Sequence, residues 1–144
     1  MTCKTPFWLR ACLCLVVGAC DDSTKLLVYD NIGALCLLQE GSQITIRARL
    51  DPCLQGNCRR KQDSNCHAEL SDGSIIVTSR IEVLEDTAPE QCPDGCSGVD
   101  QPCGVVTAPN EGELSVVYGS EQATVDVPLT DRVALFGNTR PCEF

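Results

Sequence analysis

Cys20 is the residue whose surroundings most clearly define a chemical reaction. It directly follows "VGA", the end of the uncharged stretch "ACLCLVVGA", and basic residues lie upstream at Lys4 and Arg10. A basic start followed by a short apolar run is typical of a secretory signal, and the run is too short to span a membrane. An aliphatic residue and two small residues before a cysteine match the bacterial lipobox, in which the thiol accepts lipid. The sequence therefore predicts a signal peptide over residues 1–19 and a lipidated Cys20; the alternative is an ordinary signal peptide cut near Ala19.

Lipid on Cys20 determines where the chain is expected to reside. A diacylglycerol on sulfur and an acyl chain such as palmitate on the amino group give stable membrane anchoring together, because a single chain holds only marginally. Residues 20–25 then form a short tether, and no later run approaches the ~20 apolar residues of a membrane span. We expect a lipoprotein of the bacterial cell envelope, on the outer membrane or cell surface. Asp21 and Asp22 would favour inner-membrane retention under enterobacterial sorting rules, which vary between lineages.

Eight cysteines remain for the folded part once the predicted signal and Cys20 are set aside. An even number of cysteines in an exported chain is typical of disulfides, so we expect four bridges. Each bridge typically stabilises a fold by ~2–4 kcal/mol. The eight residues are Cys36, Cys53, Cys58, Cys66, Cys92, Cys96, Cys103 and Cys142.

The spacing of these cysteines restricts how they can pair. Two groups of three neighbouring cysteines, at residues 53–66 and 92–103, leave Cys36 and Cys142 alone. Because three is odd, each group must send at least one bond outside itself if all eight are oxidised. The simplest pattern has one internal pair within each group and uses Cys36 or Cys142 as a distant partner.

The segment "CPDGCSGVDQPC", residues 92–103, is the densest cluster of possible metal ligands and is expected to form a rigid turn cluster. Its C-x3-C and C-x6-C spacings differ from those of common zinc modules, and an oxidising envelope favours disulfides over thiolate ligands. A redox site would need the C-x2-C spacing at the start of a helix. We therefore expect no metal and no cofactor.

His67 is the only histidine of the chain and is the first candidate for a general base. Asp51, Asp63 and Glu69 lie near it in the sequence, and serines could act as nucleophiles. No G-x-S-x-G motif is present, and His67 has the outward parity of the predicted strand "CHAEL". The sequence therefore predicts a surface histidine and no enzyme, with a hydrolase as the less favoured alternative.

The elements that would hold these residues are β-strands. Apolar and polar residues alternate in "QITIRARL", "CHAEL" and "IIVTSRIEVL", as they do in half-buried strands. The residues expected to point inward are Ile44, Ile46, Ala48, Leu50, Cys66, Ala68, Leu70, Ile75, Val77, Ile81 and Val83. Asp72 and Gly73 predict a hairpin between the second and third of these strands, since both residues tolerate positive φ.

Further strands are predicted at "KLLVYD", "GALCLLQ", "LSVVYG", "ATVDVPL" and "RVALFG". About seven or eight short strands separated by turns are typical of a β-sandwich or barrel. We expect an all-β domain over residues 26–144, an antiparallel β-sandwich stapled by disulfides. The cysteine-bearing connections, residues 51–65 and 86–101, are expected to be loops at its ends.

The charge of the chain limits its partners. Eleven basic and twenty acidic residues give a formal net charge of −9, and removal of Lys4 and Arg10 leaves nine basic residues and a charge of −11. An acidic surface repels phosphates, so no nucleic-acid partner is expected. A protein or glycan partner is not identified by the sequence.

Five short motifs occur along the chain: the lipobox "VGAC", the loop "LDPCLQGNC", the hairpin "CHAELSDGSIIVTSR", the segment "CPDGCSGVDQPC" and the closing strands "GELSVVYGSEQATVDVPL". Together they resemble those of small cysteine-rich lipoproteins of myxobacteria and related bacteria. The resemblance implies a lipid anchor, disulfides and a β fold, and it implies no assigned activity and no catalytic residue.

These observations favour a lipid-anchored binding or structural module of the cell envelope without catalytic activity. An inhibitor or protective factor that presents a disulfide-bounded loop, such as residues 92–103, to an envelope protease is the alternative, because a preorganised loop loses little entropy on binding.

Overall fold

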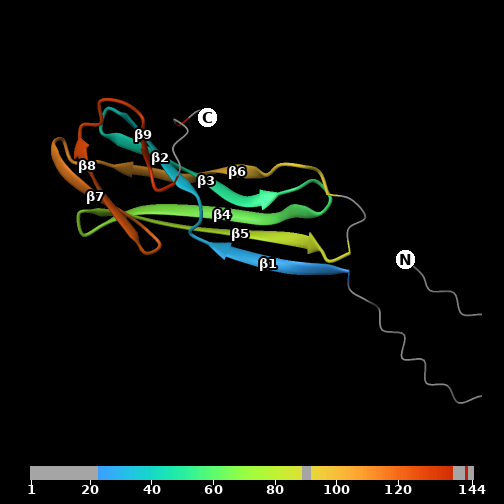
Figure 1. Ribbon diagram of the computed structural model, residues 1–144. Coiled ribbons are helices and arrows are strands. Elements are labelled where there is room, and N and C mark those ends of the chain that lie inside the picture. The colour runs from blue at the N-terminus through green and yellow to red at the C-terminus, as the bar shows by residue number, and fades with distance from the viewer. Residues whose placement is uncertain (1–22, 89–91, 138–141, 143–144) are drawn as a thin grey trace, which may run out of the picture.

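The computed structural model describes residues 23–88, 92–137 and 142, and these form β-strands joined by turns, with no helix in the described part. Figure 1 shows the strands in two packed layers. The strands are β1 (Thr24–Asp30), β2 (Ala34–Glu40), β3 (Gln43–Leu54), β4 (Arg59–Ser71), β5 (Ser74–Asp86), β6 (Ser97–Thr107), β7 (Gly112–Tyr118), β8 (Glu121–Val127) and β9 (Val133–Leu135). Thr24 and Lys25, expected in the tether, are therefore the first residues of β1.

The strands form two sheets that pack face to face as a β-sandwich (Figure 1). The first sheet contains β4, β5, β1, β7 and β8, and the second has the order β6-β3-β2-β9. Cys66 of β4 and Cys103 of β6 form a disulfide that joins one edge of the first sheet to an edge of the second. The expected disulfide-stapled, all-β sandwich is confirmed, with nine strands in place of seven or eight.

The core consists of the inward residues of both sheets, as the alternation predicted. Every inward residue named above for β3 and β5 is at most 1% exposed. The end of β4 is the exception, because Leu70 is 42% exposed although it has the inward parity. It lies next to the hairpin at the end of an edge strand, where the second sheet no longer covers it. The hairpin itself forms as predicted, with positive φ at Asp72 and Gly73.

Of the two long connections predicted as loops, residues 51–65 are largely strand, whereas in residues 86–101 the described residues 87, 88 and 92–96 lie outside the strands. β3 runs to Leu54 and β4 starts at Arg59, so the turn between them covers only residues 55–58. β6, the strand that was not predicted from the sequence, covers residues 97–107 and includes Pro102. It is an edge strand, and its register against β3 shifts beside Pro102, which are the circumstances in which a sheet accepts proline.

One strand pair is parallel, and this pair shapes the candidate site. β5 crosses to β6 in the second sheet, and the chain then returns to the first sheet as β7, so β7 runs parallel to β5. β4 occupies one edge of β5 along its length, and β1 and β7 share the other edge. β1 ends at Asp30 opposite Arg80, and β7 ends at Tyr118 opposite Val77. The two strands therefore point their carboxyl ends at each other beside Ser79.

Candidate functional site

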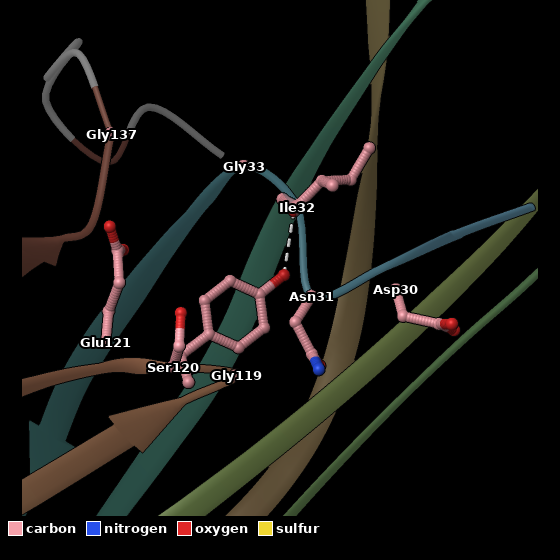
Figure 2. Close-up of a pocket in the computed structure, with 9 residues that line it drawn as sticks. Asp30, Asn31, Ile32, Gly33, Gly119, Ser120, Glu121 and Gly137 are labelled. Atoms are coloured by element: carbon pink, nitrogen blue, oxygen red, sulfur yellow. Dashed lines mark hydrogen bonds between the residues drawn. The ribbon is translucent and has the colours of Figure 1, made fainter.

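An open pocket of about 660 Å³ lies where β1 and β7 end (Figure 2). Asn31 closes the gap between the two strand ends. Its backbone amide donates to the carbonyl of Ser79 at 2.9 Å, and its side-chain oxygen accepts from the Ser79 amide at 2.8 Å. Asn31 has φ 53°, a left-handed conformation that asparagine tolerates better than most residues. Asn31 thus supplies the hydrogen bonds that a neighbouring strand would otherwise make with Ser79 of β5, and its backbone conformation directs the chain toward β2.

Tyr118 forms the buried part of the pocket lining, and its side chain is 2% exposed. Its hydroxyl donates to the carbonyl of Ile32 at 2.8 Å, the hydrogen bond drawn in Figure 2. Because that bond uses its only proton, the hydroxyl of Ser79, 2.7 Å away, donates to Tyr118. Burial raises the pKa of Tyr118 above its ordinary value, and the hydrogen bond from Ser79 acts in the opposite direction. Tyr118 therefore holds the β1–β2 connection against β5 as a neutral phenol.

The pocket rim carries two carboxylates from different segments. Asp30 belongs to the end of β1, Glu121 begins β8, and Figure 2 shows them on opposite sides of the pocket. Asp30 is also 3.6 Å from a guanidinium nitrogen of Arg80, which partly offsets its charge. Ser120 adds a hydroxyl between these walls. The lining contains no lysine, arginine or histidine, so the pocket suits a small ligand that is cationic or rich in hydroxyl groups.

Glycine is required at two positions of the pocket wall. A β-carbon on Gly33 would lie 1.8 Å from the carbonyl oxygen of Arg49, and one on Gly119 would lie 2.9 Å from the β-carbon of Asn31. Both residues also have positive φ. The tight approach of these segments exposes main-chain groups to the pocket, where they can hydrogen-bond a polar ligand.

The eight cysteines of the folded part form four disulfides, all of which connect distant segments. The pairs are Cys36–Cys142, Cys53–Cys96, Cys58–Cys92 and Cys66–Cys103. Each group of three sends all its bonds outside itself, so the expectation of at least one such bond per group is confirmed. The internal pair expected within each group is wrong, and Cys36 and Cys142 bond to each other.

The extended backbone excludes two of those internal pairs, Cys58–Cys66 and Cys96–Cys103. Cys66 is in β4, which begins directly after Cys58, and eight residues of strand span about 26 Å. Cys96 and Cys103 are separated in the same way along β6, whereas the Cα atoms of a disulfide are at most about 7 Å apart. Across the sheet, however, Leu54 of β3 pairs with Ser97 of β6, and the residues just before these partners, Cys53 and Cys96, have Cα atoms 4.4 Å apart.

The other residues singled out in the sequence do not come together as a site. His67 lies on the outer face with its side chain 72% exposed, 3.8 Å from Glu69. Asp51 pairs with Arg49, and Asp63 caps the backbone amide of Ser64. Among the described residues, no group of three or more histidines, cysteines or acidic residues is placed to hold a metal ion.

The lipid acceptor Cys20 and the signal peptide over residues 1–19 lie outside the described residues. Within the described part, no helix is long and apolar enough to cross a bilayer. The chain matches no protein-family model, no curated protein and no solved structure.

The sequence analysis did not find the pocket residues. Asn31 and Gly33 break the apolar pattern between β1 and β2, and "YGSE" marks the turn between β7 and β8. Those two local signals identify turns. Nothing in them indicates that the turns meet, because that contact depends on β1 and β7 sharing one edge of β5.

Proposed function

We propose that this protein is a lipid-anchored, non-catalytic binding module of the bacterial cell envelope, held at the membrane through Cys20. The observation that carries the proposal is the short distance between the lipobox and the rigid fold. Ser23, three residues after Cys20, already accepts hydrogen bonds from the backbone amide and hydroxyl of Thr87, at 2.7 and 3.0 Å. A lipid on Cys20 would therefore hold the sandwich close to the bilayer.

The lipid anchor is tested by mass spectrometry of the N-terminal peptide of the membrane-extracted protein. A peptide that begins at Cys20 and carries diacylglycerol and an acyl chain is expected. Cys20→Ala should leave the protein unlipidated and should shift it from the membrane to the soluble fraction. An unmodified peptide that begins at Cys20 or later would contradict the anchor.

The binding function is assigned to the pocket between β1 and β7. Its carboxylates and main-chain groups favour a small cationic or hydroxyl-rich ligand, and its ordered wall needs little rearrangement on binding. We would titrate an isotope-labelled Cys20→Ser chain with spermidine and, separately, with an N-acetylglucosamine tetramer. Shifts confined to the amides of Asn31, Gly119 and Glu121 support the proposal.

Matched variants show whether the binding is local. Asp30→Asn and Glu121→Gln should weaken spermidine binding, whereas Glu113→Gln, an exposed carboxylate of β7 outside the pocket lining, should not. Equal weakening by all three variants would indicate general attraction to an acidic protein. Absence of pocket shifts with both probes would leave these two ligand classes without support and favour the purely structural role.

A protease inhibitor or protective factor is the second candidate, and one observation favours it. Residues 93–96 are exposed and lie between two bridges, Cys58–Cys92 and Cys53–Cys96. Figure 1 places this segment at the same end of the sandwich as the start of β1, where a tether of a few residues would restrict access by a large enzyme. Inhibition of a panel of envelope proteases by the lipid-free chain, lost in Asp94→Arg, would favour this candidate.

A further inference from the structure

Exposed aliphatic side chains gather on the strand nearest the tether. Four large apolar side chains of the described part are markedly exposed, and two of them, Leu26 (49%) and Val28 (40%), lie on the outer face of β1. Leu26 is paired with the half-buried Leu84 of β5, which is paired in turn with Arg60 of β4. These residues therefore form a row across three strands. We call Leu26, Val28, Leu84 and Arg60 the tether-side patch.

The tether-side patch is close to the predicted lipid attachment point. Four residue steps separate Cys20 from Thr24, so the chain between them spans at most about 14 Å. Leu26 is two residues further along β1, about 7 Å away. A bilayer that holds lipid on Cys20 is therefore within reach of the patch for geometric reasons alone.

Basic residues are concentrated at the same end of the sandwich. Of the nine lysines and arginines that follow Cys20, four pair with residues 83–85 of β5: Lys25, Arg59, Arg60 and Lys61. Arg59 is partly used by its ion pair with Glu85, at 3.4 Å. Only Arg60 shares the face of the patch, and Glu82 and Asp63 pair beside Val28 on that face, so the contact with the headgroup layer depends mainly on the aliphatic side chains.

β1 also determines how deep such a contact can be. Among the described residues β1 pairs only with β5, so its other edge presents unpaired backbone amide and carbonyl groups. Unpaired backbone groups are costly in hydrocarbon and are satisfied among headgroups and water. A contact through β1 is therefore interfacial, with aliphatic side chains reaching the boundary of the acyl chains.

We propose that the tether-side patch rests on the headgroup layer of the membrane that holds Cys20, and that this contact orients the sandwich. The inference depends on the lipid anchor proposed above. Three aliphatic side chains contribute too little for independent binding, but they act as a second, cooperating signal beside the lipid. The pocket begins at Asp30, about 20 Å along β1 from Thr24, and so remains open to solvent.

The orientation can be measured with single tryptophans, because Trp8 in the predicted signal peptide is the only tryptophan of the chain. Leu26→Trp is the test variant. Val105→Trp is the matched control, since Val105 is 54% exposed on the second sheet, paired with Thr45 far from the turn at residues 55–58. The lipidated proteins are placed in phosphatidylcholine/phosphatidylglycerol vesicles with and without brominated acyl chains, and flotation is measured on the same samples.

Brominated lipid should reduce the fluorescence of Leu26→Trp by about half, as expected for a side chain at the acyl boundary, and should leave Val105→Trp unchanged. Floating protein with no quenching at Leu26→Trp, or with equal quenching at both positions, overturns the orientation and leaves the anchor intact. A blue shift without quenching shows that a second copy covers β1 and also overturns it. Failure of the parent protein to float overturns the lipid anchor, and this proposal with it. If Leu26→Trp lacks a cooperative melting transition, Val28→Trp takes its place.

Discussion

Removal of the Cys36–Cys142 bridge should destabilise the fold more than removal of any other bridge. The reason is the length of chain that each bridge closes when the remaining bridges are intact. Without Cys36–Cys142, the shortest connection runs from Cys36 to Cys53, across the Cys53–Cys96 bridge, and on to Cys142, which is about 63 residues. Without Cys58–Cys92, the connection through the same bridge is only about 9 residues.

These lengths set the size of the expected difference. In the chain-entropy relation a loop of about 63 residues corresponds to about 4 kcal/mol and one of about 9 residues to about 2.5 kcal/mol. Packing does not oppose this difference, since Cys36, Cys142 and Cys58 are buried whereas Cys92 is exposed. Cys36→Ala/Cys142→Ala should therefore cost about 1.5 kcal/mol more than Cys58→Ala/Cys92→Ala.

The measurement is guanidinium unfolding without reductant, followed by circular dichroism, on both double variants in a Cys20→Ser background. The sequence separation of 34 between Cys58 and Cys92 would suggest a substantial effect if each bridge acted alone. Equal losses of unfolding free energy in the two variants, or a larger loss for Cys58→Ala/Cys92→Ala, would therefore contradict the idea that Cys53–Cys96 makes Cys58–Cys92 partly redundant.

Three further predictions concern the core and the pocket wall. Val77→Asp places a charge in the core and should cost several kcal/mol in thermal melts, whereas Thr78→Asp on the exposed face should be mild; equal tolerance would contradict the assigned faces. Tyr118→Phe removes a hydroxyl that hydrogen-bonds both Ser79 and the carbonyl of Ile32, and it should lower the free energy of unfolding by about 1–3 kcal/mol in chemical denaturation. An unchanged free energy of unfolding would contradict a stabilising role of these hydrogen bonds. Because burial raises the pKa of Tyr118, its contribution is complete below its ordinary value of 10.0 and declines as the pH rises above it; the Tyr118→Phe variant should therefore lose less stability between neutral pH and pH 11 than the parent protein.

The faces of the long strands could be predicted because the period of two is a local property of the sequence. Ile44, Ile46, Ala48 and Leu50 alternate with polar residues, and all four are fully buried in β3. β6 could not be recognised in this way. Its segment contains Pro102, Cys103 and Gly104, which interrupt any alternation, and its register against β3 shifts where the proline lies. The pairing partner makes this segment a strand, and a local pattern does not reveal a partner.

The candidate site depends on the same kind of non-local information. The sequence identifies the turns after Asp30 and Tyr118, and it identifies the strands that precede them. Their meeting requires that β7 return to the edge of β5 already used by β1, after the chain has passed through the second sheet. That return depends on how the chain crosses between the two sheets. The sequence pattern indicates only antiparallel hairpins between consecutive strands, so it does not predict the pocket.

The start of the fold is joined to β5 along the whole length of β1. β1 and β5 are paired over seven residues, from Thr24 opposite Asp86 to Asp30 opposite Arg80. If the proposed anchor on Cys20 pulled along β1, the force would load these pairs together in shear. Arg59 donates to the hydroxyl of Tyr29 and pairs with Glu85, which ties β1 to β4 and β5 beneath the same region. Cys58 then fixes that end of β4 to Cys92, so the strand that would receive a load from the proposed anchor lies within a few residues of the covalent network.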